Sequence, residues 1–238
     1  MEKKKALYYV DEWANFYLSL FGEAKHMESH DNGCYTKIWP KQSEKGPTSI
    51  FNIRLEQLSD DDLARTVQEI KAVNCHTWWN LSYPEKIKNI IYPDGWSACT
   101  PNDWEVYSVM LPEELPAYVD SPVCVRRVES NSDFIVWTAI INDSIQKNHY
   151  HLCQNGMMRC YLGYCDDTPV SAAAILKNKG ICSVEFATTL SDYRKKGFAA
   201  AVCQTAIKEA IHDGAEVITV RAYGESKLLG KKLGFIYI

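Results

Sequence analysis

The stretch from Ser183 to Gly214 constrains the fold of this chain most, because it joins a strand-like run to a long helix through a short basic turn. The run up to Thr188 is rich in β-branched and aromatic residues, as strands are. The helix is expected to stop at Gly214, since glycine commonly adopts the left-handed conformation that follows a helix end. Between them lies the turn Arg194–Gly197, with three consecutive cations before the glycine.

Such a turn is suited to hold a phosphate group. The main-chain N–H groups of a helix's first turn have no partner within the helix, and the positive end of the helix dipole adds to them. Gly197 lets the backbone approach a ligand closely, and the small residues Ala199–Ala201 keep the next turn slim. The sequence therefore predicts an anion site here; the alternative is a charged helix start that holds no ligand.

Length and composition narrow the possible classes of protein. A chain of 238 residues is long enough for one large or two small domains. Its formal net charge of -4 argues against a nucleic-acid binder, and no apolar run reaches the roughly 20 residues that span a bilayer. The nine cysteines are odd in number and form no CxxC pair, so we expect reduced thiols, no metal site and a cytoplasmic location.

The N-terminal half has the pattern of an α/β domain. One helix is predicted around Trp13 and Phe16, and another after Ser59, a favoured N-cap that three aspartates follow. Further elements are predicted as strands at Cys34–Trp39, Ser49–Leu55 and Cys75–Leu81, and as a short helix after Ser82.

Prolines interrupt the chain in the segment Leu111–Pro122. This interruption predicts an N-terminal domain of residues 1–118 and a C-terminal domain of residues 119–238.

The C-terminal half alternates strands and helices in a regular order. A strand, a helix carrying Phe134 and Trp137, and a looser helical stretch are predicted to come before three strands that turns connect. The predicted strands are Val123–Val128, Met158–Cys165, Val170–Leu176, Ile181–Thr188 and Val217–Ala222, and the last helix is Ser226–Leu233. A final strand is predicted to begin at Gly234 and Phe235.

Two motifs in this half resemble those of the GNAT acyltransferase superfamily. Arg194, Gly197 and Ala199 fall on the defining positions of its acetyl-CoA loop, Arg/Gln-x-x-Gly-x-Gly/Ala. The segment Leu229–Phe235 is similar to the family's Leu-Tyr-x-Lys-Leu-Gly-Phe signature. The resemblance covers residues 123–238.

The resemblance implies an α/β (α+β) fold with a mixed, mostly antiparallel sheet flanked by helices, preceded by a smaller α/β domain. That N-terminal domain is either an accessory domain or a degenerate GNAT-like half. In the second case it has lost its cofactor site, because aspartates stand where a phosphate loop would lie. Most GNAT domains also have a further strand after the one begun by Phe235. The N-terminal half or a second subunit, in a homodimer, is expected to supply it.

The activity implied is transfer of an acetyl group from acetyl-CoA to a small-molecule or peptide amine, by direct attack and without a metal. The pantetheine arm of acetyl-CoA would pair with Phe186, Ala187 and Thr188, where two central strands separate. The pyrophosphate would bind at the turn formed by Arg194, Lys195, Lys196, Gly197, Phe198 and Ala199.

The catalytic residues are harder to assign from the resemblance than the residues that would bind acetyl-CoA. Glu185 is the candidate base, the alternative being an ordinary ion pair with a neighbouring cation. The family's usual proton-donating tyrosine falls on Gly230, so Tyr223 is the candidate donor, with Tyr193, Tyr164 and water as alternatives. Two other functions stay open. One is a non-catalytic module that binds acyl-CoA or a partner, and the other is an aminoacyl transferase acting on charged tRNA.

Overall fold

The computed structural model describes residues 3–22, 27–42, 48–73, 75–78, 106–112, 123–141, 150–222 and 224–237. The chain divides into two compact units, Met1–Asn102 and Asp103–Ile238. Among the described residues, no helix combines the length and the apolar character that crossing a bilayer requires. The cysteines described are all free thiols.

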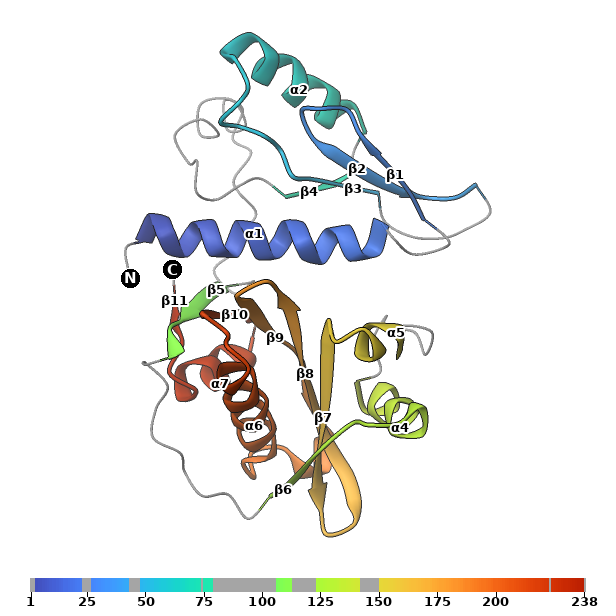
Figure 1. The fold of residues 1–238 in the computed structure, drawn as a ribbon, viewed down its shortest axis with the longest axis vertical. Coiled ribbons are helices and arrows are strands. Elements are labelled where there is room, and N and C mark those ends of the chain that lie inside the picture. The colour runs from blue at the N-terminus through green and yellow to red at the C-terminus, as the bar shows by residue number, and fades with distance from the viewer. Residues whose placement is uncertain are drawn as a thin grey trace. The chain divides into compact units, whose positions relative to one another are not determined.

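The described part of the N-terminal unit is a small sheet with the helices α1 and α2 (Figure 1). Its elements in chain order are α1 (Lys3–Gly22), β1 (Met27–Asp31), β2 (Thr36–Pro40), β3 (Ser49–Phe51), α2 (Asp60–Val73) and β4 (His76–Thr77). The strands lie in the order β1-β2-β3-β4; only the last pair, which α2 connects, is parallel. The core packs Ile50, Ile53 and Leu55 against Leu63 and Val67 of α2.

The elements of this unit differ from the predictions in several places; the predicted strand Cys75–Leu81, for example, is β4, His76–Thr77, in the described residues. The predicted strand Ser49–Leu55 ends at Phe51, because Asn52 takes a positive φ of 53° and turns the chain out of the ladder. Strand β1 was not predicted, since four of its five residues are exposed and its sequence shows no apolar alternation. The helix predicted after Ser82 lies outside the described residues.

The C-terminal unit contains a seven-stranded sheet. Its strands are β5 (Val106–Met110), β6 (Cys124–Arg127), β7 (Met158–Cys165), β8 (Thr168–Asn178), β9 (Ile181–Thr189), β10 (Val217–Ala222) and β11 (Ile236–Tyr237). Its helices are α4 (Asn131–Ile141), α5 (Tyr150–Gln154), η3 (Ser191–Tyr193), α6 (Phe198–His212) and α7 (Ser226–Lys232).

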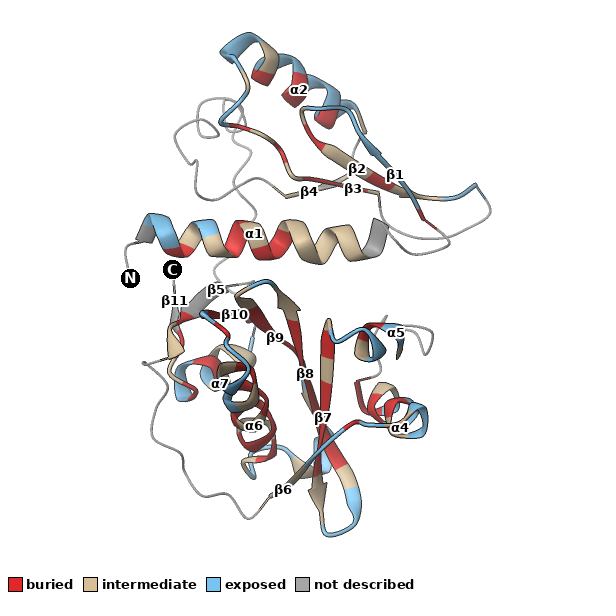
Figure 2. Cartoon of the chain, viewed as in Figure 1, coloured by how far each residue is buried: buried red, intermediate tan, exposed pale blue. Residues whose placement is uncertain are grey.

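The sheet order is β11-β5-β10-β9-β8-β7-β6, and β9–β10 is its parallel pair. The predicted mixed, mostly antiparallel sheet is therefore confirmed. Helix α6 covers one face and α4 and α5 cover the other (Figure 1). The buried residues of α6 pack against β8, β9 and β10 to form the core of the unit (Figure 2).

Strand β5 lies between β10 and β11 and is antiparallel to both. It provides the strand that separates β10 from β11 in this sheet. The expectation named the N-terminal half or a second subunit as the source of a further strand, and β5 lies within the predicted N-terminal half, residues 1–118. The strand therefore comes from the same chain, and it lies on the N-terminal side of residue 118 although it belongs to the C-terminal sheet.

Candidate active site

The two central strands of the C-terminal sheet separate partway along their length. Ladder pairing of β9 with β10 runs from Ile181–Val217 to Val184–Val220 and stops there, although both strands continue. The later residues of β9 still pair with β8, so only their side toward β10 is released. This places Phe186, the first of the predicted arm-binding residues, just beyond the point of separation.

A β-bulge in β9 accompanies the separation. Ala172 pairs with Thr188 and Ala174 pairs with Glu185, which leaves Phe186 and Ala187 opposite the single residue between them on β8. Phe186 has a φ of 58°, an unusual value for an aromatic residue. A bulge re-aims the main chain, and bulges of this kind are common beside active sites.

The predicted anion turn follows β9 and precedes α6. Gly197 is the N-cap of α6 with a φ of 91°, and no side chain caps the helix. Lys195 also has a positive φ, of 61°, so the backbone alternates in handedness before the helix. Within the described residues, the N–H groups of residues 195–200 donate no hydrogen bond; the first helical bond runs from Ala201 N to Gly197 O (3.0 Å). Such a run of free N–H groups forms an anion-binding concavity.

Arg194 ties this turn to the separated strand. Its Nε donates a hydrogen bond of 3.1 Å to the carbonyl oxygen of Thr189, the last residue of β9. Lys195 and Lys196 are exposed, and the ammonium of Lys196 lies 5.4 Å from the ring centroid of Tyr193. A Cβ at Gly197 would meet no atom within 4 Å, so glycine is required there by its φ and not by crowding within the protein.

Glu185, the predicted base, is a buried carboxyl group with 7% of its surface exposed. The hydroxyl of the fully buried Ser183 donates a hydrogen bond of 2.6 Å to its Oε1. The prediction overlooked Ser183. The two-residue spacing within a strand, which places both side chains on one face, was the signal available.

Two of the tyrosines proposed as proton donors lie in the described part of the chain, and each has an aromatic or cationic neighbour. Tyr223 lies outside the described residues. Tyr193 packs edge-on against Phe198 (centroid separation 6.0 Å), and the ring of Tyr164 lies beneath the guanidinium of Arg126 at 4.5 Å. Gly230 is buried in α7 and its carbonyl accepts the N–H of Phe235. The described part of the chain contains no cluster of three or more side chains that could hold a metal ion.

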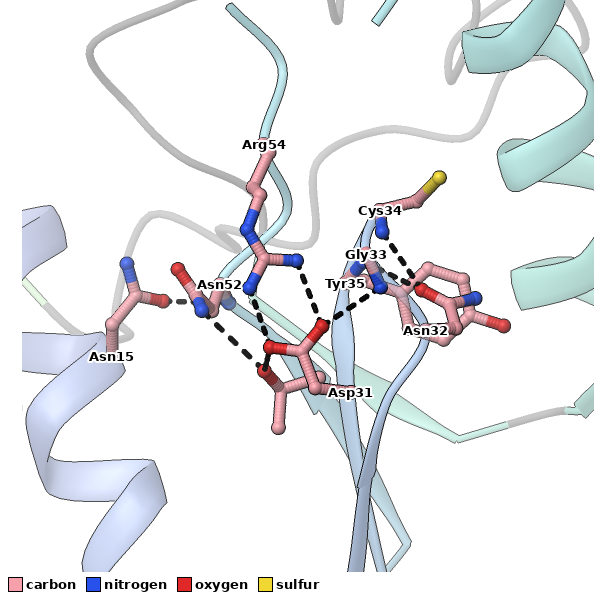
Figure 3. Close-up of polar contacts among 9 residues, drawn as sticks. Asn15, Asp31, Asn32, Gly33, Cys34, Tyr35, Asn52 and Arg54 are labelled. Atoms are coloured by element: carbon pink, nitrogen blue, oxygen red, sulfur yellow. Dashed lines mark hydrogen bonds and ion pairs between the residues drawn. The ribbon is translucent and has the colours of Figure 1, made fainter. Parts of the chain in front are cut away.

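The N-terminal unit repeats the strand–helix–strand order of the site. Here, however, a main-chain N–H after the strand and another in the first turn of the helix donate to side chains of the unit. The succession β3–α2–β4, with a parallel pair, matches β9–α6–β10. Asn52, whose φ is 53°, follows β3, and its N–H donates to Oδ1 of Asn15 at 2.8 Å (Figure 3). The N-terminus of α2 is capped by Ser59, whose Oγ accepts the N–H of Asp62.

An ion pair lies beside Asn52 in the same region (Figure 3). Arg54 binds both carboxylate oxygens of Asp31, with Nη1 2.9 Å from Oδ1 (Figure 3). The hydrogen bonds from Arg54 lower the pKa of Asp31 to about 2. Asn32 accepts the N–H groups of Cys34 and Tyr35 through one oxygen, at 2.9 Å each. The start of α2 therefore differs from that of α6, because a side chain caps it and its first turn carries three aspartates in place of cations.

No protein-family model and no curated protein matches the sequence. Solved structures do match it. A GCN5-related N-acetyltransferase from Kribbella flavida has a TM-score of 0.62 at 14% identity, over 92% of this chain and 89% of that one. A functionally unknown conserved protein from Staphylococcus epidermidis has a TM-score of 0.52 at 11% identity, over 92% of this chain and 93% of that one. At these identities the likeness shows the fold alone.

Proposed function

We propose that this chain, which has the GNAT fold, is an acyl-CoA-dependent N-acyltransferase that transfers an acetyl group from acetyl-CoA to a small-molecule or peptide amine. The observation that carries the proposal is the hydrogen bond between Arg194 and Thr189. It joins a turn whose N–H groups donate no hydrogen bond to an edge of β9 that pairs with no strand, both within the part of the chain that the structure describes. A ligand with an anionic end and an amide-containing arm fits this pair of features.

The cofactor would bind along these two features in order. Its diphosphate would accept hydrogen bonds from the N–H groups of residues 195–199, with the charges of Arg194, Lys195 and Lys196 beside it. Its arm would pair with the main chain of residues 186–188, as an added strand pairs with a sheet edge.

The chemistry assigned to the chain is direct attack by the amine nitrogen on the thioester carbonyl. An alkylamine with a pKa near 10.4 is mostly protonated at neutral pH, so a base must take its proton; we assign this to Glu185. An N–H group at the bulge would stabilise the charge that develops on the carbonyl oxygen. The new C–N bond forms, the C–S bond breaks, and the CoA thiolate takes a proton from Tyr223 or from water.

The alternative is a module that binds acyl-CoA or a protein partner without turnover. Gly230 favours it, because no side chain stands where the family's usual tyrosine would. Release of free thiol from acetyl-CoA in the presence of a panel of amines distinguishes the two. Binding of CoA without thiol release would favour the module.

The turn itself is tested by a matched pair of variants. CoA at about 100 times its Kd should stabilise the wild-type chain by about 2.7 kcal/mol, measured as a thermal shift. Gly197→Asp places a negative charge in the anion site and should abolish the shift. Gly197→Asn has the same size and tolerates the positive φ, so it should retain most of the shift. Equal shifts in the two variants would contradict the placement of the diphosphate.

A further inference from the structure

The indole of Trp137 contacts both strands that form the β9 bulge. Its Nε1 donates a hydrogen bond of 2.9 Å to the carbonyl oxygen of Ala173, the β8 residue that has no partner in β9. Its ring meets the ring of Phe186 edge-on, with centroids 5.7 Å apart and planes at 82°. Trp137 is fully buried, so both contacts are shielded from water.

The bulge needs such support. Phe186 holds a backbone conformation that aromatic residues seldom adopt, and strained conformations persist only where the surroundings fix them. Edge-on contact between two rings is a favourable geometry. The hydrogen bond to Ala173 fixes the orientation of the indole that makes this contact.

Helix α4 holds Trp137 firmly. The helix begins with reciprocal hydrogen bonds between Ser130 and Asp133, which cap its N-terminus. Phe134 stacks on Trp137 at 5.4 Å, and Tyr150 of α5 packs on Phe134 at 5.3 Å. The hydroxyl of Tyr150 in turn donates to the carbonyl of Glu129. A continuous series of aromatic rings therefore connects α5 to the bulge.

We propose that Trp137 is a positioning residue for the acyl-CoA arm. It holds the bulge at Phe186 in the conformation that keeps the end of β9 apart from β10 and presents the main chain of residues 186–188 to pantetheine and its thioester. This inference rests on the proposed function. It adds a residue that touches neither the anion turn nor the ligand.

The inference predicts different effects on binding of the two ends of the ligand, the pantetheine arm and the diphosphate. The anion turn is held by Arg194 and Thr189, and neither residue is a hydrogen-bond or ring partner of Trp137 among the described residues. Loss of the indole should therefore weaken binding of the arm and leave binding of the diphosphate unchanged. A purely structural role would weaken both ends together.

The test compares two ligands on the full-length chain by titration calorimetry. Acetyl-CoA carries the arm, and adenosine 3′-phosphate 5′-diphosphate carries the diphosphate without it. Trp137→Phe keeps an aromatic ring but loses the N–H donor, and should weaken acetyl-CoA about tenfold while the nucleotide stays within about twofold. Trp137→Leu loses both contacts and should have the larger effect on acetyl-CoA.

Ile141→Ala is the matched control, because Ile141 is buried on the same helix. This variant should lower the melting temperature without changing the ratio of the two affinities. An unchanged ratio in both Trp137 variants would overturn the inference and leave the proposed function standing. A wild-type chain that binds neither ligand would overturn both.

Discussion

The hydroxyl of Ser183 donates a hydrogen bond of 2.6 Å to Oε1 of Glu185, and both side chains are buried. A hydroxyl in this position stabilises the charged form of the carboxyl group, which is the form that accepts a proton. The pair therefore allows two separate tests. One asks whether Glu185 is the base, and the other asks whether the hydroxyl of Ser183 stabilises its charged form.

Glu185→Gln removes the base and keeps the shape of the side chain. We expect kcat for thiol release to fall by at least about 100-fold, because general base catalysis typically contributes this much or more. Affinity for CoA, measured by calorimetry, should remain unchanged. Full activity in this variant would remove Glu185 from the mechanism.

Ser183→Ala removes the donor and keeps the carboxylate. The charged form loses stabilisation, so the acidic limb of the kcat/KM profile should move to higher pH. Thr219→Val is the control, because Thr219 is a buried hydroxyl on the neighbouring strand whose hydrogen bond goes to the carbonyl of Cys182. Its profile should superpose on that of the wild type, and a shift equal to that of Ser183→Ala would argue against a specific effect.

Strand β5 predicts which fragment of the chain folds. A fragment of residues 103–238 contains β5 and should unfold cooperatively in urea. A fragment of residues 119–238 lacks β5, so β10 loses a partner along five residue pairs and the buried Met110 is missing from the core. We expect no cooperative transition in the shorter fragment by circular dichroism. Binding of CoA by that fragment with full-length affinity would contradict this role of β5.

Asp213 predicts a loss of stability at acidic pH. The hydrogen bond from Lys177 (3.0 Å) and the contact with Arg159 lower the pKa of this carboxyl group to about 2 from 3.8. Since the folded pKa is below the unfolded one, the stabilisation is fully present above about pH 4 and is lost as the pH falls towards 2. The melting temperature of Asp213→Asn should therefore lie below that of the wild type at pH 7 and converge with it near pH 2. Asp31 titrates in the same range but is present in both proteins, so the difference isolates Asp213.

The hydrogen bonds within the N-terminal unit predict how many CoA molecules bind to each chain. Ser59 accepts the N–H of Asp62 at the start of α2, Asn15 accepts the N–H of Asn52, and three aspartates stand in the first turn of α2, where they would repel a phosphate. Calorimetry should therefore give one CoA per chain. The Gly197→Asp variant should then bind none, and a remaining site in that variant would show that the N-terminal unit also binds nucleotide.

Local signals in the sequence were sufficient for much of the fold. The predicted strands Met158–Cys165 and Val217–Ala222 have the same bounds in the structure. Gly214 has a φ of 86° and follows the end of α6, as the helix stop requires. These features depend on residue type and on spacing within one segment, which a single sequence displays.

Features that depend on distant partners could not be read in this way. Strand β5 pairs with residues far along the chain, and no turn or spacing near Val106 indicates which sheet it joins. The positive φ of Phe186 has no signature, because aromatic residues seldom adopt it. Trp137 was predicted on a helix, but its contact with Phe186 requires the packing of α4 on the sheet.

Strand β5 is synthesised before both of its neighbours. During translation, roughly half of the chain must be synthesised after β5 before its partners β10 and β11 have left the ribosome. Pairing across so long a separation is slow, because the loop entropy must be overcome before any contact forms. Until then, its main-chain groups present an open edge to other nascent chains. Maturation of the C-terminal unit is thus expected to end with the capture of one of its earliest segments, and dependence on chaperones should concentrate in that interval.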